Sequence, residues 1–342
     1  MEFSDCFVEG EGELKILKSM MNFEKKEGSN YRHVVYTKDS DFILLLLACS
    51  VEDIVLINDF QRIEKKLLKN KIKMQFGGHN ESHINKIMLD IVLLCITFGN
   101  DYLEPLPHEN KLLNLLLRYK KKKLKQKYVG RFLFNLDGNK ASLDLEFLIK
   151  VLVKSKDAKT SQSSAKEVAE TRNYMTSLLW CMSAYAEGCC KDYGFSPHCK
   201  PPMLMSHLIQ DIKNMIASGG KMLTYNTEGT SSLIPVTFLL SIMPYTVFKQ
   251  NIPKNILGVI EKDRSIIVDF MNHVLQPEHF GKLKQLEGKL AELKQPLSSY
   301  EDSEIWMEKL LGQPQTFIVS KERLSLTYLT IGRLFKQSKK KC

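Results

Sequence analysis

Apolar runs alternate with short polar segments along the first part of the chain, and this pattern predicts an α/β fold. Residues 32–37 combine β-branched and aromatic side chains, as is typical of a strand. Residues 42–48 are apolar on every side and predict a buried helix. A second strand is predicted at residues 54–57, and a long apolar helix at residues 84–98. The basic segment at residues 60–74 is expected to be helical or linking.

Shorter features fill the rest of this region. A helix at residues 14–21 is expected to give way to a polar loop at residues 24–30. Residues 111–128 are expected to be helical. Residues 137–139 (Asp-Gly-Asn) predict a turn, and residues 143–153 predict an amphipathic helix.

Beyond residue 153 the pattern is mainly helical. Residues 154–166 are poor in apolar side chains, which is typical of a linker. Helices are expected at residues 167–187, 203–217, 235–243 and 282–294. The expected organisation is an α/β domain at 1–153, a linker at 154–166, a helical second region at 167–296, and a C-terminal extension with a basic tail at 297–342.

Acidic residues stand at the ends of three of the predicted elements. Asp39 and Asp41 follow the first strand, where the ligand crevice of an open α/β sheet lies. Because Asp is a favoured N-cap, Asp39 could instead cap the following helix, and one Asp could do both. Glu11 and Glu13 lie two residues apart in a glycine-interrupted turn.

The third acidic position follows the long apolar helix. Gly99 and Asn100 are typical of an ordinary helix C-cap, which does not account for Asp101 directly after them. Five acids from three chain segments are the kind of ligand set that a binuclear metal site needs.

The charge and the cysteine content of the chain bear on its binding partners and its cellular compartment. A net charge of +10 favours a polyanionic partner or simply a basic surface. The lysine-rich segment at residues 118–131 could contact phosphates or form a solvated face. No apolar run reaches the ~18 residues of a membrane span, and no signal peptide is recognisable. A zinc site is a weaker interpretation of the Cys- and His-rich segment, because it has no C-x2-C spacing and adjacent cysteines do not easily bind one tetrahedral ion; its residues are Cys181, Cys189, Cys190, His198 and Cys199. Without a secretory signal, we expect reduced thiols and an intracellular protein, cytoplasmic or nuclear.

These acidic motifs together resemble the XRN family of 5′→3′ exoribonucleases. Residues 10–15 (Gly-Glu-Gly-Glu-Leu-Lys) are similar to the family's Gly-Glu-Gly-Glu-His-Lys motif. Residues 39–41 (Asp-Ser-Asp) are similar to its Asp-Ala-Asp motif, and residues 99–107 to its Gly-Asn-Asp-Phe-Leu-Pro-His-Leu-Pro motif. Segments at 180–188, 235–244 and 265–270 extend the resemblance to roughly residues 8–275.

The resemblance implies a PIN-like 5′-nuclease α/β core with an incomplete sheet, followed by a mainly helical second conserved region. It implies hydrolysis of RNA with Mg²⁺ (or Mn²⁺) as cofactor, by a two-metal mechanism. The residues that it implies as catalytic metal ligands are Glu11, Glu13, Asp39, Asp41 and Asp101. Those that it implies at the RNA are Lys15, as a supporting charge near the acids, with Trp180, Tyr185 and His198.

Departures from the family pattern leave other functions open. The family's catalytic region begins well upstream of the Gly-Glu-Gly-Glu motif, so we expect weak or no activity from this chain alone, and an upstream polypeptide could complete the domain. Leu14 replaces a His, and residues 191–202 have lost most of the family's aromatic residues. The alternatives are a non-catalytic RNA-binding or interaction protein and a DNA nuclease of the flap-endonuclease type.

Overall fold

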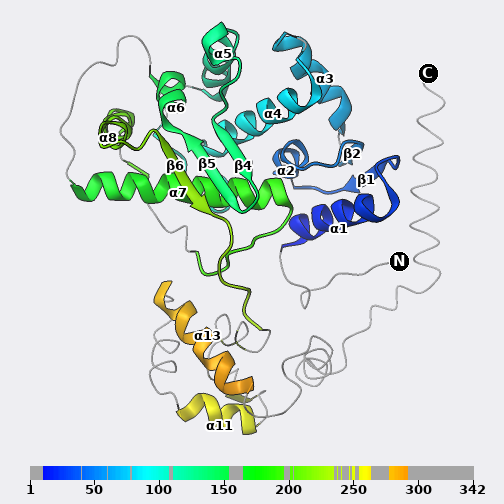
Figure 1. The fold of residues 1–342 in the computed structure, drawn as a ribbon. Helices are drawn as coiled ribbons and strands as arrows, with labels where there is room; N and C mark the ends of the chain where they lie inside the picture. Colours follow the sequence, from blue (N-terminus) through cyan, green and yellow to red (C-terminus); the bar gives the residue numbers. More distant parts are fainter. Residues whose placement is uncertain are drawn as a thin grey trace. The chain divides into compact units, whose positions relative to one another are not determined.

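The computed structural model describes residues 11–107 without 40, 60 and 78, residues 111–153, and residues 165–234 without 196–200 and 203. It also describes two later helices and a few positions between 237 and 250. The chain forms two compact units, residues 1–232 and 233–342, which are described separately (Figure 1).

The first sheet of unit 1 has the order β1-β2-β3. Strands β1 (His33–Tyr36) and β2 (Ile54–Ile57) are parallel, and helix α2 (Phe42–Ala48) connects them. These three elements confirm the predicted strand, buried helix and strand. The antiparallel strand β3 (Arg62–Glu64) was not expected, because its charged ends give no apolar strand pattern.

Helix α1 (Gly12–Glu27) is longer than predicted. Its buried residues Leu14, Leu17 and Met20 recur every three positions and form one apolar stripe. The polar loop expected from residue 24 is wrong, since the charged residues there continue the helix on its solvent side. The helix ends at Gly28, which has φ 88° and donates its N–H to the Glu24 carbonyl.

Helices α3 (Lys65–Gln75), α4 (Glu81–Ile96) and α5 (Leu112–Lys123) pack side by side, with α4 in the middle (Figure 1). The short helix η1 (Gln126–Tyr128) follows α5. The apolar character of α4 is explained by its position, because it packs against α2 as well as against α3, α5 and elements later in the chain. The prediction of helices at 84–98 and 111–128 is confirmed, with small differences at their ends.

A second sheet, with the antiparallel order β4-β5-β6, was missed by the sequence pattern. Strands β4 (Phe134–Asp137) and β5 (Lys140–Asp144) form a hairpin around the predicted turn, where Gly138 has φ 54°. Strand β6 (Met222–Asn226) pairs with β5. Helix α6 (Leu145–Leu152) begins two residues later than predicted, because residues 143–144 belong to β5.

Helices α7 (Ala165–Glu187) and α8 (Met205–Ala217) confirm two predicted helices and belong to unit 1. In Figure 1, α7 runs beneath the β4-β5-β6 sheet, and it packs against α2, α4, β5 and β6. The compact unit therefore extends to residue 232, whereas the sequence-based organisation placed a domain boundary at 154–166.

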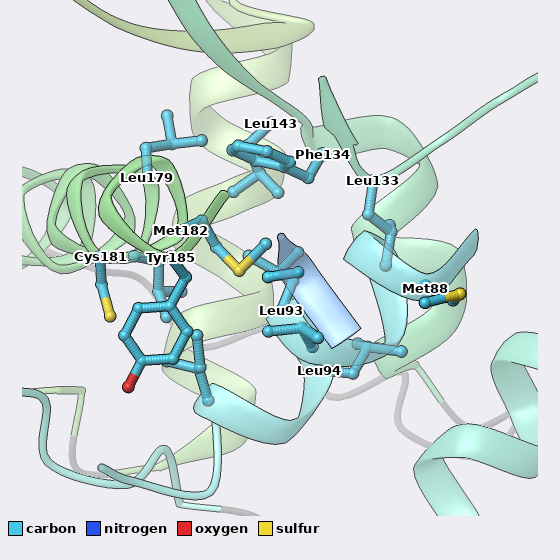
Figure 2. Close-up of a cluster of buried hydrophobic side chains, with 14 of the residues drawn as sticks. Met88, Leu93, Leu94, Leu133, Phe134, Leu143, Leu179, Cys181, Met182 and Tyr185 are labelled. Atoms are coloured by element: carbon cyan, nitrogen blue, oxygen red, sulfur yellow. The ribbon is translucent and has the colours of Figure 1, made fainter. Parts of the chain in front are cut away.

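One hydrophobic core joins the two sheets of unit 1. Figure 2 shows Met182 of α7 between Leu93 of α4 and Phe134 of β4. All three side chains are at most 1% exposed. The core thus fixes α7 to the C-terminal part of α4, directly before the predicted site residue Asp101.

Unit 2 is described through helices α11 (Lys254–Lys262) and α13 (Pro277–Ala291). The second of these confirms a helix near residues 282–294, with earlier bounds. Glu287 of α13 accepts hydrogen bonds from the Ile234 N–H (2.6 Å) and the Thr237 hydroxyl (2.7 Å). The predicted helix at 235–243 and extension at 297–342 lie largely or wholly outside the described residues. Across the described helices, none has the length and apolar character to cross a membrane.

Candidate active site

Asp39 and Asp41 lie in the short turn between β1 and α2. The Asp39 N–H donates to the Thr37 hydroxyl oxygen (3.0 Å), and the Asp39 carboxylate accepts from the Asp41 N–H (2.8 Å). Asp41 takes the N-cap position of α2 through its backbone carbonyl, and its side chain makes no capping hydrogen bond. Helix capping, the alternative explanation for Asp39, therefore does not account for either carboxylate.

Asp101 lies on an exposed loop directly after α4, and Asn100 holds that loop in shape. The Asn100 side-chain oxygen accepts from the Tyr102 N–H (3.2 Å) and the Leu103 N–H (2.9 Å). Its amide group donates to the Tyr185 hydroxyl (3.1 Å) and approaches the Cys181 sulfur (3.3 Å), both on α7. One side chain thus ties the acidic loop to the long helix of the core.

The electrostatics show that the aspartates from these two loops lie near one another. The pKa of Asp41 is raised, first by its partial burial and then by the negative charges of Asp39 and Asp101. Like charges disfavour the ionised form of a carboxyl group, and a bound cation would remove that penalty. The folded chain therefore places the charges of Asp39 and Asp101 where both disfavour ionisation of Asp41.

Glu11 joins this region from α1. The Tyr102 hydroxyl donates to a Glu11 carboxylate oxygen, so a side chain from the Asp101 loop contacts the start of α1. Burial, and then this bond to Glu11, raise the pKa of Tyr102. Glu13 is half-buried in the first turn of α1, where a negative charge also favours the helix dipole.

The donor chemistry of these acids fits a hard divalent cation, which prefers oxygen ligands. Their geometry fits less well: within the described residues, no three His, Cys, Asp or Glu side chains converge into a group that could hold a metal ion. The structure thus brings the acidic loops into one region, while the five-residue ligand set stays a prediction.

The residues predicted to contact RNA have mainly internal partners in this structure. Tyr185 is 4% exposed, and burial raises its pKa; its hydroxyl points away from the apolar cluster in Figure 2, towards Asn100. The Trp180 indole N–H donates to the Asp192 carbonyl (3.0 Å). The Trp180 ring stacks on the Phe195 ring, with 5.8 Å between the ring centroids. These contacts give Tyr185 and Trp180 a supporting role, and RNA contact by either side chain stays a prediction.

The other two predicted RNA-contact residues are less defined. Lys15 is half-buried one turn into α1, where its N–H donates to the Glu11 carbonyl (3.0 Å). His198 lies outside the described residues.

Sequence reasoning missed Asn100, Tyr102 and Cys181. We interpreted Gly99 and Asn100 as a helix cap, and Gly99 does have φ 98°. The additional role of Asn100 depends on α7, 85 residues further along the chain. A local signal existed only for Tyr102, whose hydroxyl stands where the family motif has Phe. Burial raises the pKa of the Cys181 thiol to about 12, so this sulfur is an inert neighbour of the site.

Comparison with known proteins bears on the same region. Residues 1–60 match the family model described as the N-terminus of XRN 5′-3′ exonucleases, a match that includes four of the five predicted acids. The Acanthamoeba polyphaga mimivirus protein named "Putative 5'-3' exonuclease R528" is 24% identical over 169 residues. That alignment covers 44% of this chain and 27% of the viral protein. The two similarities support the expected assignment of this chain to the XRN 5′-3′ exonuclease family.

Proposed function

We propose that this protein is a 5′-3′ exoribonuclease-like enzyme that hydrolyses RNA phosphodiester bonds with the help of divalent cations. The observation that carries the proposal is the grouping of Asp39, Asp41 and Asp101 at the ends of β1 and α4, in a chain assigned to the XRN family. The Asp39 carboxylate accepts a hydrogen bond from the Asp41 N–H within the turn, but that bond does not explain why the charges of Asp39 and Asp101 both lie near the Asp41 carboxyl group, whereas a cation-binding role does.

The carboxylates that would hold the cations are Asp39, Asp41 and Asp101, with Glu11 and Glu13 contributed by α1. When bound, Mg²⁺ or Mn²⁺ would activate a water molecule and stabilise the charge on the leaving oxygen. The chain's own contribution is to keep these acids in place. Asn100 orients the Asp101 loop, and the Tyr102 hydroxyl holds the Glu11 carboxylate.

Single substitutions of the aspartates test this proposal. Asp41→Ala and Asp39→Ala are each expected to lower Mg²⁺-dependent release of mononucleotides from a 5′-monophosphorylated RNA by at least about 100-fold, since each removes a charge that the reaction needs. Asp137→Ala, which replaces an exposed acid at the end of β4, is the matched control and should leave the rate unchanged. Undiminished turnover by Asp41→Ala would disprove the metal-ligand assignment.

A non-catalytic RNA-binding role is the second candidate. This role is favoured because the described side chains include no group of three His, Cys, Asp or Glu that could hold a metal ion. In that case RNA would bind equally well with EDTA and with Mg²⁺, and no mononucleotide would be released. Substituting a DNA of the same length for the RNA separates both functions from a DNA nuclease of the flap-endonuclease type.

A further inference from the structure

An apolar groove of about 260 Å³ lies between α3, α4 and α5. None of the predicted site residues lines it within the described part of the chain. Its apolar lining includes Leu68, Ile72, Ile91, Leu113, Leu116 and Leu117. Figure 1 shows these three helices together on one flank of unit 1, with α4 between the other two.

The rim of this groove exposes large aliphatic side chains. Leu113 and Leu117 of α5 are 65% and 53% exposed, and they lie one turn apart on the same helix face. Leu67 and Met74 of α3 are also exposed, at 56% and 74%, although they do not line the groove. A cluster of exposed apolar side chains around a groove is typical of a surface that binds another molecule.

The two charged residues that line the groove, Lys71 and Lys120, are both basic. Helices α3 and α5 each contain five Lys or Arg residues and no acid. Lys66, Lys69 and Lys73 pair with acids outside α3. Lys71 and Lys120 belong to the groove itself, and the Lys120 ammonium donates to the Gln75 side chain. An occupant that complements this surface must therefore combine apolar and acidic groups.

We propose that the groove binds an acidic amphipathic helix of a partner protein. Leucine-like side chains at i, i+4 and i+7 of that helix would fill the groove, in the helix-in-groove mode. Its flanking carboxylates would pair with Lys71 and Lys120. This binding surface is separate from the nuclease function proposed above.

The lining favours a protein partner over RNA. Single-stranded nucleic acid binds to grooves that offer aromatic rings on which bases stack. Here the groove contains two aromatic rings, those of Phe76 and Tyr119, which are 6% and 0% exposed. The two rings pack against each other, with their centroids 5.8 Å apart. What remains accessible is aliphatic, and aliphatic side chains match the apolar face of a helix.

The test uses the full-length protein and a fluorescein-labelled synthetic peptide with Leu at i, i+4 and i+7 and Glu on the flanking positions. Fluorescence anisotropy is expected to show saturable binding. Leu117→Glu should weaken it at least about tenfold, because it places a charge in the apolar contact. Lys71→Glu, at an exposed position, should weaken binding and reduce its dependence on salt.

The matched control is Leu204→Glu, because Leu204 precedes α8 and does not line the groove, and its exposure of 54% is close to the 53% of Leu117. It should leave the affinity unchanged, and a peptide of the same composition with scattered leucines should not bind. The proposal is overturned by absence of saturable binding, by equal binding of the scattered peptide, or by an equal loss in Leu204→Glu. Two further results would also overturn it: displacement of the peptide by an RNA oligonucleotide whose own binding needs Leu117, and self-association of the protein that Leu117→Glu abolishes.

Discussion

Asp90 lies within α4 and Asp41 caps the neighbouring helix α2, yet the surroundings of the two carboxylates differ in kind. Asp90 is fully buried in α4, where it accepts hydrogen bonds from the Tyr119 hydroxyl (2.7 Å) and the Phe134 N–H (2.9 Å). Asp41 is half-buried at the start of α2, where other acids are its electrostatic neighbours. A buried carboxylate that accepts hydrogen bonds, such as Asp90, has a structural role. A carboxylate whose neighbours are other negative charges, such as Asp41, is instead a candidate for cation binding.

The largest expected effect is a loss of stability on substitution of Asp90, the structural carboxylate. Asp90→Ala leaves the Tyr119 hydroxyl and the Phe134 N–H unpaired in the core, which should lower the free energy of unfolding by roughly 2–5 kcal/mol. Urea denaturation followed by circular dichroism measures this loss. The exposed Asp101→Ala should change the free energy of unfolding by no more than about 0.5 kcal/mol. Similar losses in both variants would mean that burial does not distinguish the two kinds of carboxylate.

A smaller effect is expected at Asn100, which links the acidic loop to the core. Asn100→Ala removes the bonds to the Tyr102 and Leu103 N–H groups and to the Tyr185 hydroxyl, so the proposed activity should fall about tenfold, as for residues that orient metal ligands. The Mg²⁺ concentration for half-maximal activity should rise, and hydrogen exchange at residues 102 and 103 should quicken.

Tyr185→Phe is the partner variant for Asn100→Ala, because it removes a single hydroxyl. Its effect should be weaker, and the two substitutions together should be less than additive, because they share one hydrogen bond. Unchanged Mg²⁺ dependence in Asn100→Ala would reduce this residue to an ordinary helix cap.

The same comparison explains what the sequence could predict. The elements β1, α2 and β2 were predicted because each is a short apolar run with its own local signal. The sheet β4-β5-β6 was not, since its strands carry polar residues such as Asn135, Lys140 and Ser142, and β6 joins from far along the chain. Only tertiary pairing turns these segments into strands.

The candidate site divides in the same way. Asp39, Asp41 and Asp101 were predicted because they stand beside apolar runs and within motifs that resemble those of a known family. The contacts that surround them, such as Asn100 with Tyr185 or Tyr102 with Glu11, join residues 85 and 91 positions apart. No local pattern contains such pairs. Asp90 could be recognised as an acid within an apolar helix, but its partners Tyr119 and Phe134 could not.

The smallest expected effect tests the repulsion itself. Because the pKa of Asp41 in the folded chain is raised above its ordinary 3.8, the folded state holds this proton more tightly than the unfolded state. The contribution of Asp41 to stability is therefore complete below pH 3.8 and is lost as the pH rises through the raised pKa. In EDTA at pH 7, Asp41→Asn should be more stable than the wild type by less than about 1 kcal/mol, since solvent screens the charges.

Thermal unfolding at pH 3.5 and pH 7 measures this difference, which should shrink at the lower pH as the wild-type carboxyl becomes protonated. Adding MgCl₂ at pH 7 should raise the melting temperature of the wild type more than that of Asp41→Asn, because a ligand stabilises the state that binds it. If Asp41→Asn is instead the less stable protein in EDTA, the carboxylate makes favourable contacts, and Asp41 belongs with Asp90 on the structural side. If Mg²⁺ stabilises both proteins equally, the ion binds elsewhere and the repulsion among the aspartates needs another explanation.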